Sequence, residues 1–109
     1  MTEILLVKTT FDDLSLAEKF AEKLLNAKLA ACVSIGQAQK SFYFWENELV
    51  SAEEFSMEIK TSTKKFEQLR QFIRKNHSYQ TPEIIAVPVS LSDPDYENWL
   101  KEVLVDTGE

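Results

Sequence analysis

The feature that most constrains the fold is a pair of long extended segments in the middle of the chain, separated only by the turn Glu46-Asn47-Glu48. A straight strand over residues 30–46 would span about 55 Å, at about 3.3 Å per residue. A compact domain of 109 residues has a radius of gyration of about 13 Å, and therefore a diameter of about 35 Å. The hairpin must bend, or it must project beyond the body of the domain.

The residues of the hairpin indicate where it turns and bends. Asn47 suits the turn, because Asn tolerates a positive φ. Gly36 is expected to mark a bulge or a bend in the first segment. In the second segment apolar and polar side chains alternate, which is typical of a strand with one buried face. Phe55, Met57 and Ile59 lie on one side of this strand, and Ser56, Glu58 and Lys60 lie on the other.

The first segment ends in four consecutive aromatic residues, Phe42-Tyr43-Phe44-Trp45. On a projecting hairpin they would form a large exposed apolar patch, which usually marks an interface. Open strand edges also favour pairing with another chain. We therefore expect a homo-oligomer built through this hairpin. The alternative is a hairpin that bends at Gly36 and folds over its own sheet.

The segments on either side of the hairpin complete an α+β pattern. Hydrophobic periodicity predicts strands at Ile4–Val7 and 84–91, and helices at about 13–27, from a cap at 61–63 to Asn76, and from Ser92-Asp93-Pro94 onward. Pro88 cannot donate to a strand ladder, so the last strand is expected at an edge or with a bulge. This order predicts one domain over residues 1–109: a ferredoxin-like βαββαβ sandwich with an additional C-terminal helix and a long hairpin.

Charge and cysteine content indicate the setting in which the protein works. The net charge of −6 disfavours nucleic acid and anionic membranes as partners, because both are negatively charged. Cys32 is the only cysteine, so no disulfide can form within the chain, and a reducing compartment is expected. The N-terminal residues lack a basic leader, and no apolar run approaches the roughly 20 residues of a membrane helix. We expect a cytoplasmic protein.

Five segments in this order resemble a known family: LAACVSI, SFYFWENEL, EIKTS, NHSYQTPEIIAVPV and YENWL. They are similar to motifs of the CutA divalent-cation-tolerance family, and the resemblance extends from Ile4 to Leu104. The family implies a ferredoxin-like subunit in a tight homotrimer joined through strand edges, similar in architecture to the PII nitrogen-signalling proteins. It also implies tolerance to divalent metals, copper above all. The sequence departs from the family pattern at Ser34, Phe44, Asn47, Ser78 and Gln80; the last replaces a frequent Glu and removes a potential acidic ligand.

Three residues are the candidate metal ligands: Cys32, His77 and Glu83. Thiolate and imidazole suit Cu(I) or zinc, imidazole also suits Cu(II), and Glu83 would add a carboxylate. The expected cofactor is copper or another divalent cation. Cys32 could instead be a small buried apolar residue, and His77 could simply end a helix. Convergence of Cys32 and His77 between subunits of a trimer is one alternative, and Met57 is a further sulfur ligand unless it lies in the core.

A second group of residues favours a small-molecule site. Tyr79, Tyr43 and Trp45 could line a cleft with Lys60, which would suit a small anionic or aromatic ligand, as in a PII-like signalling module that binds its ligand in clefts between subunits. The alternative is that these aromatic residues pack in an interface. A scaffold that holds a protein partner is a third function.

Catalysis has little support in the sequence. The only glycines are Gly36 and Gly108, so there is no glycine-rich phosphate loop. The adjacent pairs Asp12-Asp13 and Glu53-Glu54 would point apart in a strand, and the first pair is explained by helix capping. We expect a binding protein rather than an enzyme.

Overall fold

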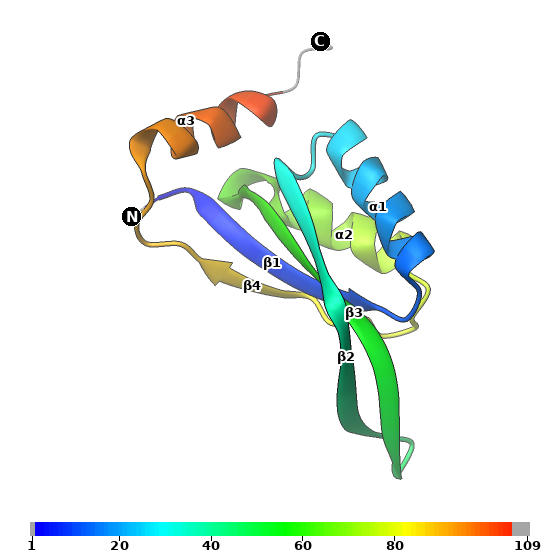
Figure 1. Ribbon diagram of the computed structural model, residues 1–109. Helices are drawn as coiled ribbons and strands as arrows, with labels where there is room; N and C mark the ends of the chain where they lie inside the picture. The colour runs from blue at the N-terminus through cyan, green and yellow to red at the C-terminus, as the bar shows by residue number, and fades with distance from the viewer. Residues whose placement is uncertain (1, 106–109) are drawn as a thin grey trace.

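The chain forms a four-stranded antiparallel sheet with two helices packed on one face and a third helix at one end (Figure 1). The computed structural model describes residues 2–105. Its elements are β1 (Ile4–Phe11), α1 (Leu14–Asn26), β2 (Cys32–Trp45), β3 (Glu48–Ser62), a short 3-10 turn (Thr63–Lys65), α2 (Phe66–Asn76), β4 (Ile85–Pro88) and α3 (Pro94–Val103).

The strand order is β2-β3-β1-β4, which is the ferredoxin-like arrangement that the element order predicts. β1 pairs with β3 from Ile4↔Ser62 to Phe11↔Phe55, so these two strands form the centre of the sheet. β4 is an edge strand, as Pro88 predicts, and Pro88 pairs with Leu5 at its end. β2 is the opposite edge.

The alternation in β3 decides which face of the sheet is buried. Met57 and Ile59 are fully buried and pack in the main core with side chains of β1, α1 and α2, including Val7, Leu24 and Leu69. The opposite face carries the polar side chains of β3. One end of this face is covered by a second apolar cluster, which brings Ile4 and Ala31 against Leu100 and Leu104 around α3. At the other end Glu54 is buried as well. Among residues 2–105, no helix is both long enough and apolar enough to cross a membrane.

The predicted turn and the predicted starts of the first and third helices agree with the structure. Glu46 and Asn47 have φ of 51° and 68°, the signature of a tight hairpin turn whose twist matches that of its strands. The Asp13 side chain accepts a hydrogen bond from the Leu16 N–H and begins α1. The Asp93 side chain caps α3 in the same way, with Pro94 in its first turn.

Three element boundaries differ from the sequence prediction. β1 continues to Phe11 instead of ending at Val7, because pairing with β3 holds its polar residues in the strand. β4 covers only Ile85–Pro88, and the Val89 N–H donates one further hydrogen bond to the Ile4 carbonyl of β1, at 3.1 Å. The second helix begins with a 3-10 turn, and Ser62 makes no side-chain cap. The Thr61 hydroxyl donates instead to the Leu29 carbonyl, at 2.8 Å.

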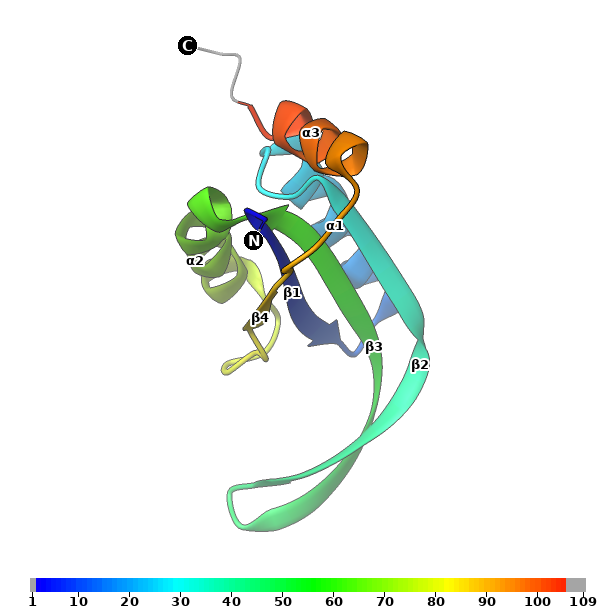
Figure 2. The same ribbon diagram turned by 90° about the vertical axis from the view of Figure 1, so that its left-hand side faces the viewer.

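The long hairpin both bends and projects. The register of β2 against β3 shifts between Ile35 and Ala38, which is the bulge expected at Gly36. A Cβ at Gly36 would lie 2.6 Å from the Ser56 hydroxyl oxygen, so a larger residue there would require the Ser56 side chain to move. The hairpin still extends beyond the body and curves toward the side on which the segment around residue 80 lies (Figure 2). The molecule measures 45 × 30 × 23 Å, and Phe42 and Phe44 at the hairpin tip are 67% and 74% exposed.

Candidate functional site

Cys32 lies at the start of the edge strand β2 and is half-buried. It is paired with Lys60 of β3, which in turn pairs with Leu6 of β1. Because the order of the strands puts β2 at the edge, one side of the strand at Cys32 has no partner strand among residues 2–105. Cys32 is therefore on a part of the subunit that another chain can approach.

His77 follows the last residue of α2, and both of its ring nitrogens are already used within the subunit. Nε2 lies 2.8 Å from the Thr10 carbonyl oxygen, and Nδ1 accepts the Tyr79 N–H at 2.9 Å. These two bonds require the proton on Nε2, since a carbonyl oxygen can only accept. The ring also stacks on Phe11, with centroids 4.1 Å apart.

The surroundings of His77 favour its neutral form. Burial lowers the pKa of the ring, while the bond to the Thr10 carbonyl and the charges of Asp12 and Glu54 oppose that shift without cancelling it. A metal ion could bind either nitrogen only if the ring gave up a hydrogen bond. In the folded subunit His77 therefore holds the segment after α2 against the end of β1.

Glu54 is buried and connects β1 to the segment after α2. Its Oε2 atom accepts hydrogen bonds from the Tyr79 hydroxyl at 2.8 Å and from the Thr10 hydroxyl at 3.3 Å. Burial and the bond to Glu54 raise the pKa of Tyr79, so its hydroxyl remains a donor. Thr10 thus accepts a hydrogen bond from His77 through its carbonyl and donates one to Glu54 through its hydroxyl. We call Thr10, Glu54, His77 and Tyr79 the Thr10 network.

A cleft of about 790 Å³ lies between the hairpin and the segment 79–83. We call it the hairpin cleft; its lining includes Thr10, Asp12, Phe42, Tyr43, Trp45, Glu54, Tyr79, Pro82 and Glu83. Three of the four residues predicted for a small-molecule site, Tyr43, Trp45 and Tyr79, therefore lie together, as does Glu83 from the predicted metal set.

Lys60 does not line the hairpin cleft. It lies on the same strand as Glu54, six positions further along, which corresponds to about 20 Å along the strand. The expectation of an anionic ligand depended on this lysine. The charged residues that do line the cleft are the acids Asp12, Glu54 and Glu83.

The predicted metal ligands do not form one site within the described subunit. Residues 2–105 contain no group of three or more His, Cys, Asp or Glu side chains placed to hold a metal ion. Cys32 lies at the level of Leu6 of β1, whereas His77 contacts Thr10, four positions or about 13 Å further along that strand. Met57 is fully buried in the core.

Thr10 and Glu54 belong to the site, although the sequence pattern does not predict them there. Glu54 is on the polar face of β3, where alternation predicts a solvated side chain, yet it is only 6% exposed. It is buried because the segment after α2 brings Tyr79 onto it, a contact between positions 25 residues apart. A carboxylate on a polar strand face gives no local signal of such a contact.

Comparison with known proteins identifies the family. The sequence pattern described as "CutA1 divalent ion tolerance protein" matches residues 5–103. The chain belongs to the CutA1 family. It is 40% identical over 95 residues to the divalent-cation tolerance protein CutA of Archaeoglobus fulgidus, covering 87% of this chain and 92% of that protein. It is 35% identical over 104 residues to the CutA protein of Pectobacterium atrosepticum, covering 95% and 94% of the two chains.

The fold agrees with that of solved CutA structures. The structure described as the periplasmic divalent cation tolerance protein CutA from Archaeoglobus fulgidus superimposes with a TM-score of 0.90 at 37% sequence identity. The match covers 94% of this chain and 99% of the other. Both the predicted ferredoxin-like fold and the predicted CutA resemblance are confirmed.

Proposed function

We propose that this CutA-family protein acts in divalent-cation tolerance by binding copper, or another divalent cation, as a homotrimer. Its family membership supports the link to divalent cations, since the relatives of known sequence carry that description. The net charge of −6 gives a surface that attracts cations in general and disfavours nucleic acid and anionic membranes as partners.

The observation that carries this proposal is the position of Cys32 on the edge strand β2. A half-buried thiol there can meet donors of a second subunit if strand edges pair in the assembly. A site shared between subunits is consistent with the separation of Cys32 from His77 and Glu83 in one chain. His77 can take part only by exchanging one of its two hydrogen bonds for the metal.

Copper titration of the metal-free protein by calorimetry tests the metal site. Cu(I) is added under anaerobic reducing conditions, and Cu(II) is added in air. We expect Cys32→Ser to weaken Cu(I) binding by at least about tenfold, because the soft thiolate is lost, and Glu83→Gln or His77→Gln to weaken Cu(II) binding. Ser34→Ala, two residues along β2, is the matched control. Equal affinity in the parent and all three ligand variants, with assembly unchanged by sedimentation, would rule out this site.

We propose further that the protein is a binding protein and not an enzyme, and that it works in the cytoplasm. The separation of Cys32 from His77 along the sheet supports the first point, because a nucleophile and its base need hydrogen-bond contact. The single cysteine supports a reducing compartment. The Archaeoglobus structure is described as periplasmic, so cell fractionation with a tagged full-length protein is the direct test of location.

A second candidate function is supported by the hairpin cleft. Its volume lies within the range of about 300–1,000 Å³ that is common for small-molecule sites, and it combines Tyr43, Trp45 and Tyr79. This arrangement supports a PII-like module that responds to a small ligand. A ligand that binds the folded protein raises its melting temperature. A screen of anionic, neutral and cationic metabolites in which none raises the melting temperature would count against this function.

A further inference from the structure

The hairpin cleft has an unusual combination of side chains for a small-molecule site. The charged residues that line it, Asp12, Glu54 and Glu83, are all acidic, and no lysine or arginine is among the lining residues. Its lining also includes the aromatic rings of Phe42, Tyr43, Trp45 and Tyr79. Such a cleft repels anions and offers two attractive features to a cation, carboxylates and the negative faces of aromatic rings.

The kind of cation follows from the same lining. A small divalent metal ion needs several ligand groups at coordinating distance, and residues 2–105 contain no such group. A cleft of about 790 Å³ is also far larger than one ion. Aromatic faces and carboxylates together suit a cation with apolar groups attached to its charged nitrogen.

Glu54 is the best-defined anchor in the cleft. The Tyr79 and Thr10 hydroxyls both donate to its Oε2 atom, which fixes the side chain while Oε1 accepts no hydrogen bond within the described chain. The residue is only 6% exposed. A carboxylate that is buried and held by neutral donors is stabilised by an opposite charge placed beside it.

From this arrangement we propose that the hairpin cleft binds an organic cation, an amine or a quaternary ammonium compound, with Glu54 as its charge partner and Trp45 and Tyr79 as its aromatic walls. This inference rests on the second proposed function, the binding of a small molecule in the cleft, and names the class of that ligand. It differs from the small anionic or aromatic ligand that the sequence predicts for a cleft that includes Lys60.

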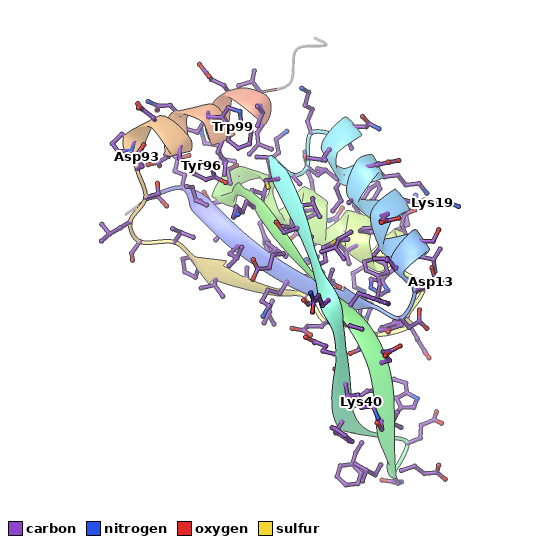
Figure 3. All side chains as sticks on the ribbon, in the orientation of Figure 1. Asp13, Lys19, Lys40, Asp93, Tyr96 and Trp99 are labelled. Atoms are coloured by element: carbon purple, nitrogen blue, oxygen red, sulfur yellow. The ribbon has the colours of Figure 1, made fainter. Side chains whose placement is uncertain are left out.

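Three probes of similar size, benzylammonium, benzyl alcohol and benzoate, separate the effect of ligand charge on affinity from the effect of ligand shape. Calorimetry gives their affinities, and fluorescence in a Trp99→Phe background follows Trp45 alone, because the chain has two tryptophans. Trp99 lies on α3, at the opposite end of the molecule from the hairpin tip (Figure 3), so its removal leaves the cleft unchanged. We expect benzylammonium to bind at least about tenfold more tightly than benzyl alcohol, with no binding of benzoate.

Two variants connect the binding to the cleft. Glu54→Gln keeps an amide oxygen that can accept from Tyr79, so the fold is retained, and it should weaken benzylammonium binding by about tenfold. Glu53→Gln is the matched control, because the adjacent side chain lies on the other face of β3 and is exposed. Melting temperatures of both variants verify that they fold.

Each outcome decides between the proposals. Benzylammonium that binds no better than benzyl alcohol would overturn the organic-cation class while leaving a small-molecule cleft. Failure of all three probes at millimolar concentration would overturn both the class and the second proposed function, as would a cleft filled by a second copy of the chain. Tight cation binding that Glu54→Gln leaves unchanged would place the cation elsewhere and overturn the assignment of the site.

Discussion

Two buried threonines on the central strands differ in one hydrogen bond. Thr9 of β1 and Thr61 of β3 are both fully buried. The Thr61 hydroxyl donates to the Leu29 carbonyl at 2.8 Å, whereas the Thr9 hydroxyl is buried without a hydrogen-bond partner. A buried polar group without a partner carries a desolvation cost that folding does not repay.

The pair predicts opposite effects for the same substitution. Thr9→Val should raise the free energy of unfolding by about 1 kcal/mol, because it removes an unpaired hydroxyl at nearly constant shape. Thr61→Val should lower it by about 1–2 kcal/mol, because the Leu29 carbonyl loses its donor. Urea unfolding at one fixed protein concentration measures both values. Destabilisation by Thr9→Val equal to that by Thr61→Val would show that Thr9 has a partner in solution.

The Thr10 network makes stability depend on pH through His77. Burial is the main cause that lowers the pKa of His77 in the folded state, so the unfolded chain takes up a proton at higher pH than the folded chain does. The stability that the neutral ring contributes is complete at pH values above the unfolded-state pKa of about 6.5. It is lost as the pH falls from there through the lower pKa of the folded state.

Replacement of the ring tests this dependence. His77→Gln should lower the free energy of unfolding by about 1–2 kcal/mol at neutral pH, through loss of packing and hydrogen bonds. The difference between parent and variant should then shrink as the pH falls below about 6.5. Urea unfolding at a series of pH values gives this difference directly. A difference that stays constant across the series would mean that protonation of His77 is not coupled to folding.

At the scale of the elements, short-range pattern predicts most of the structure. Alternation in β3 places Met57 and Ile59 in the core correctly, and the residues at Asn47, Asp13 and Asp93 predict the turn and two helix starts. The end of β1 was missed because its polar residues are held by pairing with β3, and pairing is not a local property.

The candidate site was harder to predict because it depends on register and on contacts across the chain. Tyr43 and Trp45 share a strand face by simple alternation, and the segment with Tyr79 reaches them only in the folded sheet. Within one subunit the register places Lys60 beside Cys32 and Leu6, away from the other three residues. Glu54 is the reverse case. Its place in the alternation predicts a solvated side chain, yet it is buried beside the cleft and accepts a hydrogen bond from Tyr79.

At the scale of the whole molecule, the projecting hairpin exposes more apolar surface than its own subunit can cover. Phe42, Phe44 and Leu49 are 67%, 74% and 67% exposed, and they lie on one strand face of the hairpin by alternation and register. The edge strand β2 is also open to pairing. Burial of one such side chain in an interface contributes about 1.5–3 kcal/mol, and a closed ring repeats each contact in every subunit.

This surface predicts an assembly that the hairpin tip controls. The parent protein should sediment as a homotrimer at micromolar concentration, and Phe44→Ser combined with Leu49→Ser should shift it toward the monomer, because the apolar contact is lost in every interface at once. Leu16→Ser removes a 44% exposed leucine on α1, away from the hairpin, and should leave the assembly intact. A monomeric parent would contradict the trimer, and a double variant that still forms trimers would place the interface away from the hairpin tip.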